Sequence, residues 1–403
     1  MNTSRPLTYV TREIERALGA DPVGDYYIVA GKTPYGEKVA AQFPGHVMLI
    51  DAPETLGTRE LIEQAAAKRM MPPNTDTIVF KNTSRVEESA TKAGIKLLNP
   101  KASLSETVEN KMSQVEWLGD LGKKYLPPHA ILPTKKLTWM GEPFVLQWAH
   151  GHTGGGTILV NSEEQLKDIQ SKFPFRMARR SPYIKGSSYT VNAVVAADKI
   201  LVGNISYQIT GMEPFTDGMF TTVGNDWSIS HDLLSETEIE YILTMVREIG
   251  TKLNVAGWRG LYGVDLIRDE ERGTIHLIEI NARQPASTTF ESYLQKENRI
   301  AGVKGITTFE AHLKALRGEH IDEELIPVND GAQIIQRVTK NVATISDGTI
   351  ATLESAGYNV IPYPNSGPNE DLIRIQSALG IMERHGVFNE RGKEIVALVA
   401  AKK

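Results

Sequence analysis

Short β-rich runs that alternate with helical patterns constrain the first part of this 403-residue chain more than any other feature. The runs occupy residues 26–30, 46–51 and 77–80, and residues 58–70 have a helical pattern. Strands separated by helices build a parallel sheet that is covered on both faces. Residues 1–105 are therefore predicted to form an α/β domain, with residues 1–25 as an irregular or helical lead-in. No G-x-G-x-x-G follows these strands, so nothing here indicates dinucleotide binding.

A different pattern begins near residue 106. Strands are predicted at residues 144–148, 158–160, 189–196 and 204–209, the last two as an antiparallel pair, and an amphipathic helix at 236–253. Ser162 and Gln165 form the capping box of a further helix. Residues 321–403 mix predicted strands (332–338, 358–362) with predicted helices (371–379, 393–401). The predicted fold class is thus α/β and α+β: a Rossmann-like N-terminal domain (1–105), a second domain (106–320) and a small C-terminal α+β region (321–403).

Composition excludes several classes of function. The formal net charge of −5 argues against a general nucleic-acid binder, which usually carries a basic face. The chain has no cysteine, which excludes disulfides, thiolate catalysis and Cys-based metal sites. No apolar run approaches the ~18 residues of a membrane span. A soluble cytoplasmic protein without nucleic-acid or membrane partners is expected.

A predicted hairpin of residues 261–267 and 274–281 carries the most informative polar residues. Because alternate residues of a strand share a face, Glu279, Asn281 and Arg283 are predicted to form one row, with Ile278 and Ile280 in the core. Asp265 on the neighbouring strand joins the row if the register allows. Two carboxylates and an amide oxygen suit Mg²⁺, or Mn²⁺ in its place, and the adjacent arginine suits a transferring phosphoryl group. The alternative is a surface hairpin with a merely solvated polar face.

A glycine-rich loop precedes this hairpin. Residues 151–157 contain four glycines between two predicted strands, more than a hairpin turn requires. Glycine lets backbone N–H groups approach a phosphate closely. The loop lacks the G-K-[ST] ending of a Walker A motif, and a flexible hairpin tip is the alternative interpretation. His152 is interpreted as a phosphate contact rather than a metal ligand.

Taken together and in this order, these segments resemble the ATP-grasp superfamily, of the carboxylate–amine or carboxylate–thiol ligase type with the architecture of biotin carboxylase and D-alanine ligase. The resemblance covers residues 1–340 in order of elements. It implies a Rossmann-like domain before an ATP-grasp domain (106–320), whose two subdomains grip ATP between them.

The resemblance also implies roles for single residues. Lys111 matches a lysine that contacts the nucleotide phosphates, and Tyr183 and Ile184 match the hinge whose backbone binds adenine. The loop residues implied to cover the triphosphate are His152, Gly154, Gly155, Gly156 and Thr157. The implied metal ligands are Asp265, Glu279 and Asn281, and Arg283 is the implied catalytic arginine near the γ-phosphate.

Two positions depart from the family pattern. The lysine before the glycine loop is replaced by Gln147, and the acids of the hinge fall on Ser181 and Ser188. The hypothesis that follows is an ADP-forming ligase that uses ATP and Mg²⁺ to activate a small carboxylate as an acyl phosphate and joins it to an amine, such as an amino acid or peptide, or to another nucleophile. A kinase acting on a hydroxyl and a degenerate nucleotide-binding scaffold without turnover are the alternatives. Whether the chain forms a homo-oligomer is left open.

Overall fold

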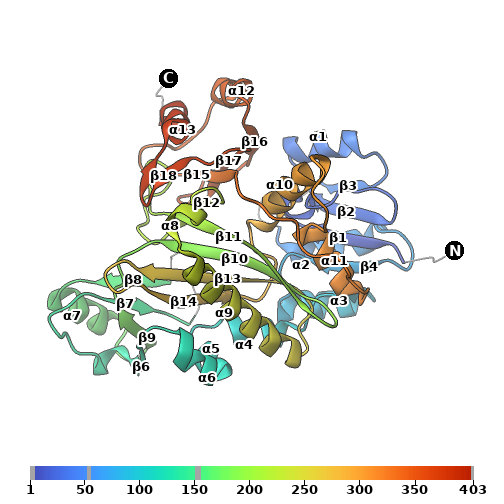
Figure 1. The fold of residues 1–403 in the computed structure, drawn as a ribbon. Helices are drawn as coiled ribbons and strands as arrows, with labels where there is room; N and C mark the ends of the chain where they lie inside the picture. Colours follow the sequence, from blue (N-terminus) through green and yellow to red (C-terminus); the bar gives the residue numbers. More distant parts are fainter. Residues whose placement is uncertain (1–4, 52–55, 150–155, 401–403) are drawn as a thin grey trace.

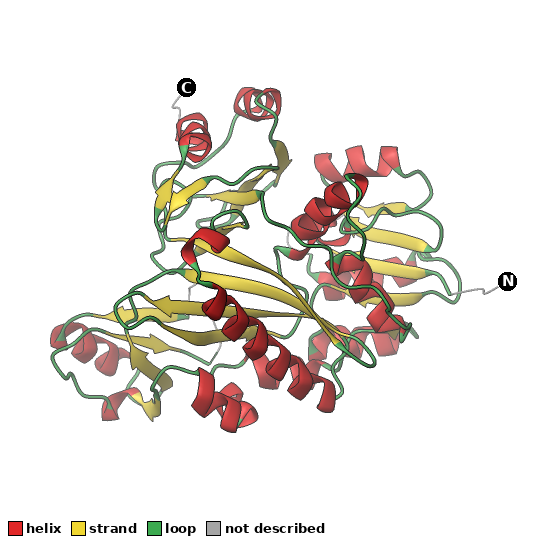
Figure 2. Ribbon diagram, viewed as in Figure 1, coloured by secondary structure: helices red, strands yellow, loops and turns green. Residues whose placement is uncertain are grey.

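The computed structural model describes residues 5–51, 56–149 and 156–400 (Figures 1 and 2). Its N-terminal part is a five-stranded parallel sheet with the order β3-β2-β1-β4-β5. The strands are β1 (Leu7–Thr11), β2 (Tyr26–Gly31), β3 (Val47–Ile50), β4 (Asp76–Val79) and β5 (Lys96–Leu97). The helices are η1 (Ile14–Ala17), α1 (Pro34–Gln42), α2 (Thr58–Ala67) and α3 (Ser84–Lys92). The predicted Rossmann-like α/β arrangement is confirmed.

One prediction for this region is wrong. The stretch expected to be an irregular or helical lead-in contains β1, the central strand of the sheet, which pairs with both β2 and β4. All five of its residues are buried. A strand covered on both faces shows no alternation of polar and apolar residues, so this short run lacked the usual strand signal.

A four-stranded antiparallel sheet lies on the other side of the molecule from the N-terminal domain (Figure 1). Its order is β6 (Ala130–Pro133), β9 (Met177–Pro182), β7 (Phe144–Gln147) and β8 (Thr157–Val160). Helices α4 (Ala102–Glu109), α5 (Ser113–Leu118) and α6 (Asp120–Tyr125) precede it, with η2 (Thr134–Lys136) after β6. Helix α7 (Glu163–Lys172) follows β8, and the Ser162 side chain caps it by accepting from the N–H of Gln165. The Gln165 side chain accepts from Asn161 N–H instead of Ser162, so half of the predicted capping box is present.

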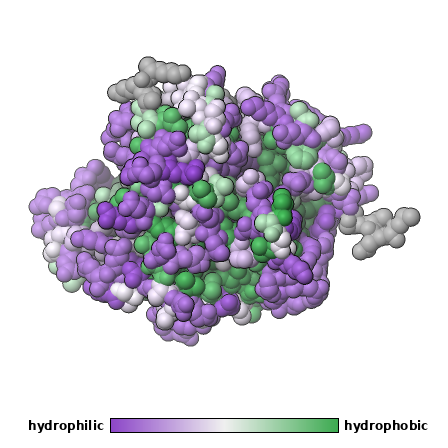
Figure 3. Space-filling view, turned by 45° about the horizontal axis from the view of Figure 1, so that its top comes forward, coloured by the Kyte–Doolittle hydropathy of each residue, from purple (hydrophilic) through white to green (hydrophobic). Residues whose placement is uncertain are grey.

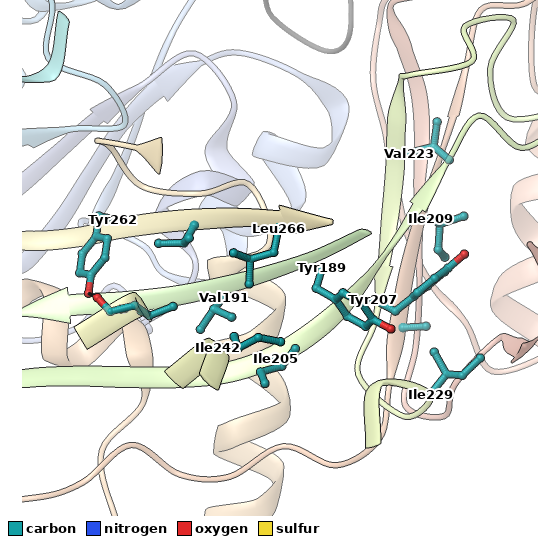
Figure 4. Close-up of a cluster of buried hydrophobic side chains, with 14 of the residues drawn as sticks. Tyr189, Val191, Ile205, Tyr207, Ile209, Val223, Ile229, Ile242, Tyr262 and Leu266 are labelled. Atoms are coloured by element: carbon teal, nitrogen blue, oxygen red, sulfur yellow. Dashed lines mark hydrogen bonds between the residues drawn. The ribbon is translucent and has the colours of Figure 1, made fainter. Parts of the chain in front are cut away.

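An eight-stranded antiparallel sheet forms the centre of the molecule, with the order β14-β13-β10-β11-β12-β15-β17-β16. Its first five strands are β10 (Ser188–Val195), β11 (Ile200–Thr210), β12 (Thr222–Asp226), β13 (Gly260–Asp269) and β14 (Thr274–Asn281). Helix α9 (Glu236–Val255), which follows the short α8 (Ser230–Leu233), covers one face. Figure 4 shows Ile242 of α9 among Val191, Ile205 and Leu266 of the sheet. Polar side chains such as Thr190, Gln208 and Asp265 lie on the opposite face of the sheet.

The last part of the chain extends the same sheet. Strands β15 (Ala332–Arg337), β17 (Asp371–Ser377) and β16 (Asn359–Pro362) complete it, with helices α12 (Asp347–Ser355) and α13 (Glu390–Ala400) and the small pair β18 (Met382–Arg384) and β19 (Val387–Phe388). The expected domain boundary at residue 320 thus separates β15, β16 and β17 from the other five strands of the same sheet. The helix predicted at residues 371–379 is wrong: most of this segment is β17. Its Ile373, Arg374, Ile375 and Gln376 alternate with a period of two, the signal of a strand.

Helices α10 (Thr288–Ile300) and α11 (Thr308–Arg317) connect the central sheet to the N-terminal domain. Phe309 of α11 packs into the N-terminal core, stacked on Tyr9 with ring centroids 6.2 Å apart. The face in Figure 3 is mainly hydrophilic at its periphery, with hydrophobic side chains toward its middle. No helix of the described residues is both long and apolar enough to cross a membrane.

Candidate active site

A cavity of about 450 Å³ lies between the four-stranded and the eight-stranded sheet. The structure brings to its wall every described residue that the sequence singled out for a site. These are Lys111, Gln147, Gly156, Thr157, Tyr183, Ile184, Ser188, Asp265, Glu279, Asn281 and Arg283. The predicted loop residues His152, Gly154 and Gly155 lie outside the described residues. The cavity also receives Arg16 from the N-terminal domain and Arg374 from β17.

The hairpin of β13 and β14 supplies the carboxylates. Its register places Asp265 opposite Glu279 and Gly263 opposite Asn281. Asp265 Oδ1 accepts hydrogen bonds from Thr190 Oγ1 (2.7 Å) and Gln208 Nε2 (2.9 Å), and its Oδ2 accepts from Asn281 Nδ2 (2.9 Å). Burial, together with the charge of Glu279, raises the pKa of Asp265 to about 6. Both effects would be relieved by a bound cation.

A β-bulge in β14 corrects one prediction. Asp265 pairs with Glu279, but the next residue, Leu266, pairs with Leu277, so Ile278 is the extra residue. Leu277 and Ile280 are therefore buried in the core, with Leu277 also touching the cavity wall, while Ile278 lines the cavity beside Glu279 without belonging to the core. Strict alternation had placed Ile278 in the core. The bulge gives the cavity an apolar wall directly next to its carboxylates.

The residues at this hairpin fit a magnesium ion by their chemistry. The set is two carboxylates and one amide, all hard oxygen donors, which is the kind that Mg²⁺ shares with phosphate and water. Among the described residues, no group of three or more His, Cys, Asp or Glu side chains could hold a metal. Asp265, Glu279 and Asn281 would therefore hold the ion only in part.

Two cations flank the carboxylates. Lys111 follows α4, is 3% exposed, and its Nζ lies 3.0 Å from Glu279 Oε2. Arg283 Nη1 donates to Glu109 Oε1 at 2.5 Å. Burial raises the pKa of Glu109, but the charges of Arg283 and Lys81 outweigh it and hold that pKa below its usual range. Glu109 was not predicted as a site residue, although it lies two residues before Lys111 in the segment that resembles the ATP-grasp superfamily.

A buried arginine stands beside Gln147. Arg179 lies opposite Gln147 in the pairing of β7 with β9 and is 4% exposed. Its Nε and Nη2 donate to Gln147 Oε1 at 3.0 and 2.6 Å, and Nη2 also donates to the carbonyl of Ile278 at 3.1 Å. Nothing in the sequence indicates the contact between Arg179 and Gln147, because that contact depends on which strand pairs with β7.

The connection from β9 to β10 forms the apolar end of the cavity. Tyr183, Ile184 and Ser188 line it, and the Tyr183 ring meets that of Phe220 edge-on. Gly186 must be glycine here, because a Cβ would lie 1.8 Å from the carbonyl oxygen of Arg268. The close approach holds this connection against β13.

Three further arginines, Arg16, Arg337 and Arg374, line the cavity. Arg374 is 2% exposed; its Nη1 donates to Gln333 Oε1 (3.0 Å) and its Nε to Tyr363 Oη (3.0 Å). Within the described chain, Arg374 Nη2 and Arg337 Nε have no hydrogen-bond partner. Arg16 donates to Glu13 Oε2 at 3.0 Å. None of the three arginines was predicted as a site residue from the sequence, and Arg374 lies in the segment that was wrongly predicted to be a helix (371–379).

Two aromatic residues at and just before the start of β13 belong to the core. Trp258 donates from Nε1 to the carbonyl of Leu261 (3.0 Å), and Tyr262 donates to that of Val246 (2.8 Å). Both side chains are buried in the core that contains α9.

Comparisons with known proteins agree with this arrangement. The ATP-grasp domain model matches residues 108–287. No curated protein matches the sequence.

Several solved structures share the fold over nearly the whole chain. N5-carboxyaminoimidazole synthetase from Staphylococcus aureus, complexed with ADP, is 11% identical with a TM-score of 0.66, covering 99% of both chains. The Aspergillus clavatus synthase, in complex with ADP and 5-aminoimidazole ribonucleotide, is 16% identical with a TM-score of 0.63, covering 99% of this chain and 98% of that one. The biotin carboxylase domain of Hydrogenobacter thermophilus 2-oxoglutarate carboxylase, with MgADP, ADP and bicarbonate, is 13% identical with a TM-score of 0.64, covering 93% and 86%. Identities this low show a common fold alone.

Proposed function

Because residues 108–287 form an ATP-grasp domain, we propose that the chain is an ADP-forming ligase that activates a carboxylate as an acyl phosphate and joins it to an amine or another nucleophile. The observation that carries the proposal is the convergence of Asp265, Glu279 and Asn281 with Lys111 and Arg283 on one cavity. Oxygen ligands and cations side by side suit the transfer of a phosphoryl group. Complexes of the similar structures with ADP support the choice of nucleotide.

The nucleotide would lie along the cavity between the two sheets. The apolar part of the cavity wall, with Tyr183 and Ile184, suits adenine. Ser188 also lines the cavity and would offer a hydroxyl to the nucleotide. Lys111, Gly156 and Thr157 are the described residues that suit the phosphates. Asp265, Glu279 and Asn281 would hold Mg²⁺, which when bound would neutralise phosphate charge.

The reaction follows from these placements in two balanced steps. A carboxylate oxygen of the substrate attacks the γ-phosphorus of ATP, the bond to the β,γ-bridging oxygen breaks, and ADP leaves. The nucleophile then attacks the acyl carbon, phosphate leaves, and an amine gives up one proton. Arg283, held by Glu109, would stabilise charge on the phosphoryl group during the first step.

Arg16, Arg337 and Arg374 on the cavity wall suit the acid substrate. Buried N–H groups without partners, such as Arg374 Nη2 within the described chain, lose hydrogen bonds that an anionic ligand can restore. A small carboxylate between Arg374 and Arg283 would face the nucleotide from the opposite end. Amino acids and short peptides are substrates of this kind.

The test is a screen for ADP release with MgATP and pools of amino acids, dipeptides and small acids. Hydroxylamine is expected to trap the acyl phosphate as a hydroxamate. A kinase acting on a hydroxyl would release ADP without a hydroxamate, and a scaffold without turnover would release none. Formation of AMP and pyrophosphate contradicts the proposal.

A further inference from the structure

We propose that Arg179 is a phosphate-binding residue of the nucleotide site and supplies the positive charge that Gln147 lacks. The inference rests on the proposed function, because it requires that the cavity binds a nucleotide. It concerns a residue of β9 that neither a motif nor the match to the ATP-grasp domain singles out.

The first observation is a buried guanidinium whose hydrogen bonds go to neutral groups, while the Glu279 carboxylate acts on it by its charge without a hydrogen bond. The hydrogen bonds of Arg179 go to the side-chain oxygen of Gln147 and the backbone oxygen of Ile278. Burial lowers the pKa of Arg179 to about 10, which still leaves the guanidinium charged at neutral pH. A buried cation is costly unless an anion compensates it. Glu279 is shared with Lys111 and with the predicted metal site, so an anionic ligand in the cavity that Arg179 lines would supply the remaining compensation.

The second observation is the orientation of the guanidinium. Gln147 and Ile278 occupy Nε and Nη2, whereas Nη1 has no partner in the described part of the chain although it is buried. One edge of the guanidinium is thus fixed by the protein, and Nη1 lacks a hydrogen bond that a bound phosphate would supply under this proposal. An arginine fixed in this way loses little conformational freedom when it binds phosphate.

The pairing of β7 with β9 explains why position 147 is an amide. Gln147 and Arg179 are directly opposite each other, and the amide oxygen accepts two bonds from the guanidinium. A lysine at position 147 would place a second cation against Arg179, and like charges at opposite positions of a sheet are unfavourable. The positive charge therefore lies on β9 instead of β7, and the Gln147 side chain orients the Arg179 guanidinium.

Arg179 also stands next to the predicted metal site. Its Nη2 binds the carbonyl of Ile278, the bulge residue, and Glu279 follows in the chain. A phosphate held by Mg²⁺ at Glu279 would lie on the side of the cavity that Arg179 lines. Arg180, the next residue, has its guanidinium 4.7 Å from the Phe144 ring centroid and is not part of the cavity wall, so it serves as a matched control.

The experiment is calorimetry of the full chain with MgADP and with adenosine, a probe without phosphates. We expect Arg179→Gln to weaken MgADP binding about tenfold to a hundredfold, the range for losing charge-assisted bonds, and to leave adenosine binding unchanged. Arg180→Gln removes the same charge and is expected to change neither affinity more than about twofold. The double variant Gln147→Lys/Arg179→Gln returns a cation to the neighbouring strand and is expected to recover MgADP binding.

The outcomes separate this inference from the proposed function. Wild-type protein that binds neither probe overturns both. Wild-type protein that binds MgADP, with Arg179→Gln binding it equally well, overturns the role of Arg179 alone. An equal loss of adenosine and MgADP binding in Arg179→Gln indicates a structural role and overturns it as well. Should Arg179→Gln fail to fold, Arg179→Lys and the double variant decide, since both keep one cation at the site and are expected to bind MgADP more tightly than Arg179→Leu, which keeps none.

Discussion

Lys111 Nζ lies 3.0 Å from Glu279 Oε2, so a predicted phosphate-binding residue and a predicted metal ligand form an ion pair. Lys111 is almost completely buried, whereas the Glu279 side chain is 24% exposed. A bound metal and phosphate would separate the pair, giving each member a new partner of opposite charge. The ion pair thus keeps both charges compensated before the substrates arrive.

Glu279→Gln is expected to reduce ADP release at least a hundredfold, because it removes a charged ligand from the predicted metal site. It should also lower the free energy of unfolding by ~1–2 kcal/mol, because buried Lys111 loses its carboxylate partner. Activity assays and urea unfolding measure the two effects. Glu271→Gln, in the exposed turn of the same hairpin, is the control and should change neither. Near wild-type turnover in Glu279→Gln would place the metal elsewhere.

Glu109→Gln tests whether Glu109 positions Arg283. The variant keeps a hydrogen-bond acceptor but removes the charge that holds the guanidinium. We expect kcat to fall about tenfold to a hundredfold, with a smaller change in the KM for ATP, because misplaced catalytic groups lose mainly transition-state stabilisation. Glu106→Gln, on the same helix but exposed and bonded to Ser84, is the control. A change in KM alone would indicate a binding role instead.

Arg374→Gln tests the proposed end of the cavity for the acid substrate. We expect the KM for the carboxylate to rise at least tenfold, because a charge-assisted bond to the substrate is lost, while MgADP affinity stays unchanged. Steady-state kinetics and calorimetry provide the two measurements. Arg384→Gln, an exposed arginine on β18, removes the same charge away from the cavity. An unchanged KM in Arg374→Gln means that the acid binds somewhere else.

Buried His312 is expected to make stability depend on pH. Its Nδ1 accepts from Leu261 N–H at 3.0 Å, and burial lowers its pKa to about 3. Between pH 6.5 and 3 the unfolded chain therefore binds a proton that the folded chain excludes, so stability falls as the pH falls.

His312→Asn should remove this contribution. The difference in unfolding free energy between wild type and variant is expected to shrink by about 2 kcal/mol from pH 7 to pH 5. Urea unfolding at both pH values measures it, with the exposed histidine variant His320→Asn as the control. A difference that is the same at both pH values contradicts a neutral buried imidazole.

Local patterns in the sequence were enough for most elements and for the composition of the predicted metal site. The alternation of strands and helices indicated the Rossmann-like domain, and the period of two in β14 placed Glu279 and Asn281 on one side. These features depend on neighbours within a few residues, so they can be read from the chain directly. Strand β17 shows the same period of two, which indicates a strand and not the helix that was predicted at residues 371–379.

Other features depend on contacts between distant segments. The register of β13 with β14 introduces the bulge that turns Ile278 toward the cavity, and the pairing of β7 with β9 brings Arg179 to Gln147. The contact of Glu109 with Arg283 joins residues 174 positions apart in the chain. Periodicity within one strand says which side chains share a face, but it carries no information on which strand becomes its neighbour or in what register. The contact partners of the residues predicted for the site were therefore set by the packing of the whole chain, whereas the predicted residues themselves could be picked out from the sequence.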